Sequence, residues 1–101
     1  MGAKPRQRPR RLAVKLRRIR EALGFSQSEI VRRLGAEDMI AFSQVSEFES
    51  GKREPSLILL LRYARLAGVI MDVLVDDEMD LPAKLPAKPT LKAKGRKGSG
   101  L

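Results

Sequence analysis

The chain has 101 residues, enough for one compact domain, and a net charge of +9 from 21 basic and 12 acidic side chains. It contains no cysteine and no histidine, which excludes disulfides, thiolate metal sites, thiol nucleophiles and imidazole bases. The start of the chain lacks the apolar run of a signal peptide, and the longest apolar run, residues 57–61, is too short to cross a bilayer. We therefore expect a cytoplasmic protein with no catalytic residues, no metal ion and no other cofactor.

The positive charge is concentrated at the two ends of the chain. Residues 1–11 contain five basic side chains and residues 82–101 contain six, and neither segment has an acidic residue. We predict a flexible basic arm over residues 1–9, a folded domain over residues 10–81, and a disordered tail over residues 82–101, which is rich in proline, lysine and glycine. Basic ends of this kind favour a polyanion as the partner.

Apolar residues at helical spacing predict the first two helices. A stripe of four apolar residues follows Pro9 and the helix ends at Gly24; the stripe consists of Leu12, Leu16, Ile19 and Leu23. The other face of this helix carries the charged residues Lys15, Arg17, Arg18 and Glu21. Ser26 caps the second helix, Glu29 lies three residues later as in a capping box, and Gly35 ends the helix.

Two or three further helices follow in the folded segment. A third helix is expected from about Ser43 to Glu49, and Ser56 caps a fourth helix over Leu57–Ala67. Residues 69–75 form a short fifth helix. The sequence therefore predicts an all-α fold, a compact domain of four or five short helices with basic ends.

Two runs of the sequence resemble the XRE family, also called the lambda repressor/Cro-like helix-turn-helix domain. They are LRRIREALGFSQSEIVRRLG and QVSEFESGKREPSLILLLRYARLAGV. The agreement includes, in order, Ser26-Gln27, Leu34-Gly35, Val45-Ser46, Phe48-Glu49 and Pro55-Ser56. The resemblance implies a lambda repressor-like domain whose helix-turn-helix covers about residues 26–50 and which binds double-stranded DNA.

The resemblance also implies roles for individual residues. Gln27 matches a position that reaches a phosphate, and Lys52 and Arg53 match the loop that contacts phosphates after the third helix. The residues at positions that face the base edges are Ser43, Gln44, Ser46 and Glu47. Arg20 and Glu49 match a structural ion pair between the first and third helices. The basic arm adds candidate minor-groove contacts through Arg8, Arg10 and Arg11.

Two departures from the family pattern bear on the third helix. The connection between the second and third helices is longer than usual, and Val31 replaces the usual alanine, a change that a longer connection tolerates. The usual Ser or Thr cap aligns with Ala41, so Ser43 could cap a shortened helix instead of meeting a base, and Phe42 could contact a thymine methyl group or fill the core. The predicted helix carries no Arg or Lys, so bidentate readout of guanine is not expected from it.

Aliphatic residues on the fourth and fifth expected helices could form a surface for a protein partner. If Leu59, Leu66, Ile70 and Val73 are exposed, they form a surface for a two-fold homodimer. The alternative is a deeper core that Met79 and Leu81 cover. The leading functional hypothesis is a sequence-specific transcriptional regulator, in particular a repressor. The competing hypotheses are an antitoxin-like module that also binds a toxin, and an RNA or membrane-surface binder driven by the basic ends.

Overall fold

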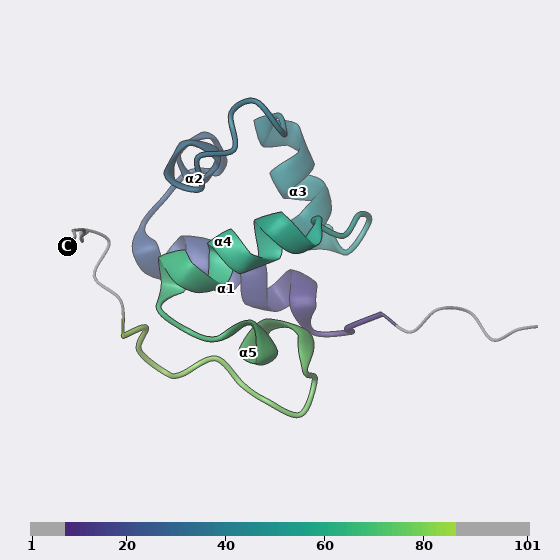
Figure 1. Ribbon diagram of the computed structural model, residues 1–101, viewed down its shortest axis with the longest axis vertical. Coiled ribbons are helices and arrows are strands. Elements are labelled where there is room, and N and C mark those ends of the chain that lie inside the picture. The colour runs from purple at the N-terminus through teal and green to yellow at the C-terminus, as the bar shows by residue number, and fades with distance from the viewer. Residues whose placement is uncertain (1–7, 87–101) are drawn as a thin grey trace, which may run out of the picture.

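The structure is a computed structural model that describes residues 8–86, and over that range it consists of five helices and no strand. The helices are α1 (Leu12–Leu23), α2 (Gln27–Arg33), α3 (Phe42–Ser50), α4 (Leu57–Ala67) and α5 (Met71–Val75). α1 packs against α4 in the middle of the molecule, with α2 and α3 on one side and α5 on the other (Figure 1). The predicted all-α fold is confirmed, and the fifth helix begins at residue 71 rather than 69.

A single core joins the five helices. Its largest fully buried side chains are Leu16, Ile19, Ile30, Val45, Tyr63 and Leu74, which come from all five helices. The predicted stripe of α1 faces this core, with three of its residues buried and Leu23 partly buried against it. Since a buried Leu or Ile contributes about 1.5–3 kcal/mol, the apolar stripe of α1 is a main source of the stability of the domain.

Local capping explains where α2 and α4 begin. The hydroxyl of Ser26 accepts a hydrogen bond from the backbone N–H of Glu29 at 3.0 Å, and Ser56 accepts one from the N–H of Leu59 at 3.2 Å. The second half of the predicted capping box is wrong. The Glu29 carboxylate binds Arg33 at 2.6 Å and also Arg32, because these guanidiniums lie one turn away on the same face. Their hydrogen bonds lower the pKa of Glu29.

The last turn of α5 is held by a lysine from α1, which corrects the placement of Lys15 on a solvated charged face. Lys15 is 3 % exposed, and its Nζ donates to the backbone oxygens of Val73 (2.7 Å), Asp76 (3.0 Å) and Met79 (2.7 Å). The three protons of the ammonium thus meet three carbonyls at and beyond the end of a helix, where carbonyls lack intrahelical partners. Burial lowers the pKa of Lys15.

The segment after α5 caps α1 in return. α1 has no side-chain cap of its own, and the Asp77 carboxylate instead accepts hydrogen bonds from the backbone N–H groups of Arg10 (2.9 Å) and Arg11 (3.1 Å). The Arg11 guanidinium donates to the backbone oxygen of Asp77 at 2.7 Å and pairs with Asp80. The backbone donors lower the pKa of Asp77. We call this set of contacts, together with those of Lys15, the α1–α5 clasp.

The long connection between α2 and α3 is held by a side chain of α4. Arg62 Nη1 donates to the backbone oxygens of Leu34 at 3.3 Å and Gly35 at 2.9 Å, which lie at the end of α2. Ala36 is fully buried, and its backbone oxygen accepts from residues 39 and 40, which makes a turn. Val31 is buried in the core beside this connection. The connection is thus an ordered part of the fold.

The aliphatic residues of α4 and α5 are mostly part of the core, which corrects the dimer surface expected from the sequence. Leu59 is 2 % exposed and Val73 8 %, and Leu81 in the chain after α5 is buried in the same core. Leu66 is partly buried against the core, and only Ile70 of the expected set is exposed. Partly buried Met79 and Leu85 extend this cover. The deeper-core alternative therefore describes this side of the molecule.

Candidate nucleic-acid interface

The carboxylate of Glu49 links α1, α2 and α3 to one another. Arg20 of α1 donates to both oxygens of Glu49 on α3, from Nε at 2.7 Å and from Nη2 at 3.0 Å, and its Nη1 donates to the backbone oxygen of Phe25 at 2.9 Å. Gln27 at the start of α2 donates to Glu49 at 3.4 Å. The Glu49 side chain is 6 % exposed and that of Arg20 15 %. The hydrogen bonds to Glu49 raise the pKa of Arg20. The pair therefore ties the helix-turn-helix to α1.

α3 divides into a buried side and an open side. Val45 and Phe48 are buried in the core. The open side, which we call the α3 outer face, consists of Phe42, Ser43, Ser46, Glu47 and Ser50. These positions follow the helical repeat, so their side chains share one face. All of them are exposed except Glu47, which is partly buried. Phe42, Ser43, Ser46 and Ser50 of this face are thus open to a ligand, whereas Glu47 also contacts the loop after α3.

Two of the predicted base-reading residues already have partners within the protein. The Gln44 Oε1 accepts a hydrogen bond from the backbone N–H of Ala41 at 3.0 Å, because Ala41 precedes α3 without a side chain that could cap it. Glu47 accepts from Arg53 Nε at 2.7 Å. The alternative in which Ser43 caps a shortened helix is wrong, because α3 begins at Phe42 and leaves Ser43 exposed within its first turn.

The structure decides one point about Phe42 that the sequence left open. Phe42 is 58 % exposed and therefore does not fill the core. It is the first residue of α3 and stands one turn from Ser46 on the α3 outer face. An aromatic ring is thus placed at the exposed tip of the helix that the family resemblance assigns to the DNA.

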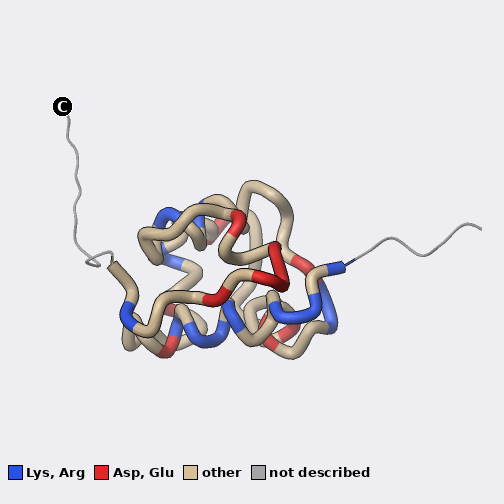
Figure 2. Tube along the Cα trace, turned by 90° about the horizontal axis from the view of Figure 1, so that it is seen from below, with Lys and Arg blue, Asp and Glu red and all other residues tan. Residues whose placement is uncertain are grey.

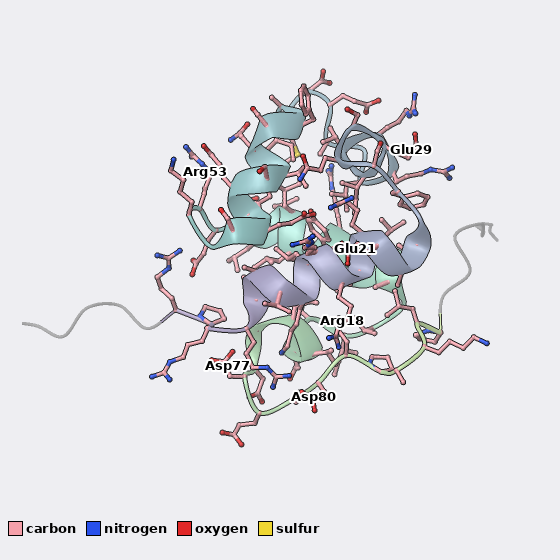
Figure 3. All side chains as sticks on the ribbon, turned by 180° about the vertical axis from the view of Figure 1, so that it is seen from behind. Arg18, Glu21, Glu29, Arg53, Asp77 and Asp80 are labelled. Carbon is pink, nitrogen blue, oxygen red and sulfur yellow. The ribbon has the colours of Figure 1, made fainter. Side chains whose placement is uncertain are left out.

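The predicted basic contacts fall into two groups. Lys52 and Arg53 are exposed in the loop after α3, and Arg8 approaches the same loop through an ion pair with Glu54 at 2.9 Å. Arg11 belongs instead to the α1–α5 clasp, where Asp80 lies at the end of the molecule away from Arg53 (Figure 3). The acidic stretch after α5 runs beside the basic start of the described chain (Figure 2). The residues of the N-terminal arm before Arg8 lie outside the described range.

Neither a metal site nor a membrane-spanning helix is found in the described part of the chain. No group of three or more acidic side chains within residues 8–86 could hold a metal ion. Over the same range, each helix is too short or too polar to cross a membrane.

Comparison with known families decides the class of the protein. A family described as helix-turn-helix matches residues 16–74, which is more than half of the chain and runs from α1 into α5. The chain belongs to the helix-turn-helix family of Cro/C1 type, the XRE family. No curated protein and no solved structure matched it. The helix-turn-helix domain is therefore a DNA-binding regulatory domain.

Proposed function

We propose that this helix-turn-helix domain is a sequence-specific transcriptional repressor that places the α3 outer face in the major groove. The observation that carries the proposal is the contrast between the two sides of α3. Its buried side is linked to α1 through Glu49, whereas Phe42, Ser43 and Ser46 on its outer face are exposed. A helix that is held rigidly at its back and open at its front suits base-edge readout, since a precisely placed helix loses little freedom on binding.

The outer face defines what kind of sequence it can read. Ser43 and Ser46 offer hydroxyls that donate to or accept from base edges, and the ring of Phe42 offers apolar contact to a thymine methyl group. Gln44 uses its amide oxygen in the cap of α3, so it can offer only its Nε2 protons without breaking that bond. We therefore place Phe42, Ser43 and Ser46 ahead of Gln44 and Glu47 as readers of the site.

A set of polar and basic residues flanks this face and suits the DNA backbone. The set comprises Gln27, Lys52, Arg53 and Arg8. Lys52 and Arg53 follow α3 directly, so they would meet phosphates on the strand beside the groove. The backbone of Arg10 is held in the clasp while its side chain is exposed, so it also remains a candidate contact. We assign no DNA contact to Arg11, because its guanidinium pairs with Asp80 at the end of the molecule away from Arg53 (Figure 3).

Selection of bound sites from random duplexes, followed by salt titration, tests this function. We expect a preferred site, and we expect Lys52→Ala to weaken all duplexes alike while lowering the salt slope by about one unit. Equal binding of every duplex by the full chain would contradict sequence-specific regulation and favour an RNA or membrane-surface binder driven by the charged ends. Repression is tested by placing the selected site over a promoter and measuring transcript levels, and activation would contradict it.

A two-fold homodimer fits this function, although its surface differs from the one expected. The exposed aliphatic residues of this part of the molecule are Leu57, Ile58, Ile70 and Val75. A dimer would present two copies of α3 about one DNA turn apart, ~34 Å, and would predict a palindromic selected site. Sedimentation of the wild type and Ile58→Asp tests the dimer, which the substitution should dissociate. A small partner chain that co-purifies and is released by Ile58→Asp would instead support the antitoxin-like alternative.

A further inference from the structure

We propose that Asp77, an acidic residue far from α3, positions Arg8 of the N-terminal basic arm for DNA binding. The clasp made by Asp77 fixes the start of α1, so that Arg8 lies beside the loop between α3 and α4. This inference rests on the proposed function. It assigns a DNA-binding role to a residue whose charge alone would oppose DNA.

The first step is the fixing of two successive backbone positions. The Asp77 carboxylate holds the N–H groups of Arg10 and Arg11 at 2.9 and 3.1 Å, while the Arg11 side chain turns to the Asp77 carbonyl at 2.7 Å. Lys15, one turn into α1, holds the other end of the same turn through Val73 and Met79. The chain therefore cannot pivot freely about the first residues of α1.

The second step is the direction that the chain takes from this fixed point. Pro9 separates the clasp from Arg8 and restricts the backbone to a narrow φ range. Arg8 then meets Glu54 at 2.9 Å, in the loop that also carries Arg53. Residues 8–10, Arg53 and Glu54 line a common groove of about 330 Å³. The basic chain thus passes within three residues from the acidic turn to the loop proposed to meet phosphates (Figure 1).

The third step is the expected effect on affinity. An arm held beside the phosphates loses less conformational freedom on binding than a free one. Release of the arm should therefore weaken binding and reduce the number of phosphates neutralised, which is read directly from the salt dependence. Removal of an acidic charge that has no positioning role should do the reverse, because it lowers repulsion from the DNA.

The experiment compares Asp77→Ala with Glu78→Ala in the full chain, on the duplex that the wild type selects. Both variants remove one negative charge from the same turn, but within residues 8–86 the Glu78 carboxylate has no hydrogen bond or ion pair. We expect Asp77→Ala to bind about three- to tenfold more weakly than the wild type, with a salt slope lower by about one unit. Glu78→Ala should bind as tightly as the wild type or more tightly.

A second pair of variants separates arm positioning from loss of folded protein. Arg8→Ala should weaken binding in the wild type but have little further effect in Asp77→Ala, because the arm is already displaced. Asp77→Asn, which keeps an acceptor oxygen, should bind more tightly than Asp77→Ala, and circular dichroism reports whether each variant is folded.

Two outcomes would overturn the inference. One is that Asp77→Ala binds as tightly as Glu78→Ala, and the other is that Arg8→Ala has its full effect in both backgrounds. If the wild type selects a preferred duplex and Asp77→Ala binds it equally well, this inference fails and the proposed function stands. If the wild type selects no duplex, the proposed function itself fails.

Discussion

The two ends of the domain treat their polar groups in opposite ways. At the end formed by α1 and α5, the ammonium of Lys15 and the carboxylate of Asp77 are satisfied by backbone groups from distant parts of the chain. At the end formed by α3, Ser43 and Ser46 are exposed along with the ring of Phe42. Charge and polarity by themselves therefore do not distinguish the two ends. What distinguishes the α3 end is that Phe42, Ser43 and Ser46 are exposed on a helix whose opposite side is buried.

The largest expected effect concerns the Arg20–Glu49 ion pair, which links α3 to α1. Arg20→Met should lower the free energy of unfolding by about 3–5 kcal/mol, because it leaves the carboxylate of Glu49 buried without its cation. Urea unfolding measures this change. Arg17→Ala is the matched control on the same helix, since the Arg17–Glu21 pair is exposed and should contribute less than about 1 kcal/mol. Equal losses in the two variants would show that the buried pair has no special role.

Removing the ammonium of Lys15, at the end formed by α1 and α5, should lower the free energy of unfolding somewhat less. Lys15→Met keeps the aliphatic stem but leaves the carbonyls of Val73 and Met79 without a donor, so we expect a loss of about 2–3 kcal/mol. Arg18→Ala, at an exposed position on the same helix, should change stability by less than about 0.5 kcal/mol. If Lys15→Met is as stable as Arg18→Ala, the contacts of Lys15 in the α1–α5 clasp do not stabilise the domain.

A smaller effect, on DNA affinity, tests the proposed contact of Phe42 on the α3 outer face. If Phe42 meets a thymine methyl group, replacing that thymine by uracil should cost the wild type about 0.8 kcal/mol, the value of one buried methyl-sized group. Phe42→Ala should bind the two duplexes equally well. Met39→Ala, which removes a neighbouring exposed apolar side chain, should keep the preference for thymine. Loss of that preference in both variants would indicate a general apolar patch instead of a specific contact.

An effect of similar size but opposite sign concerns the hydroxyl of Tyr63, which is buried between the two ends. Tyr63 is fully buried, and its hydroxyl has no hydrogen-bond partner among the described residues. Burial raises the pKa of Tyr63, with the charge of Glu49 adding to the shift. Tyr63→Phe should raise the free energy of unfolding by about 1 kcal/mol, because it removes an unsatisfied polar group. A loss of stability in thermal unfolding would contradict this and point to a partner for the hydroxyl in solution.

Local signals in the sequence were enough for most of the helices. The Ser26 and Ser56 caps and the apolar stripe of α1 depend on residues within one or two turns, and the structure confirms them. Lys15 could not be placed in this way, because its three carbonyl partners lie about 60 residues later in the chain, at 73, 76 and 79. The burial of Leu59 depends likewise on a tertiary fold that helical periodicity does not contain.

The candidate site was predicted more fully in its positions than in its chemistry. The family resemblance located the open face of α3, but it could not show that Gln44 caps the helix or that Glu47 binds Arg53. Both contacts depend on particular neighbours, since Ala41 offers no side-chain cap and Arg53 lies in the loop directly after α3. The exposure of Phe42 could not be predicted either, because it depends on where α3 begins. The unusually long connection before α3 made that start uncertain from the sequence.

An amide chemical-shift map of the full chain, recorded on titration with the selected duplex, tests the contrast between the two ends most directly. We expect the largest shifts in residues 42–53, with further shifts at Gln27 and at residues 8–11, and small shifts across α4. Largest shifts in α4 and α5, with residues 42–53 unchanged, would contradict the placement of α3 in the groove.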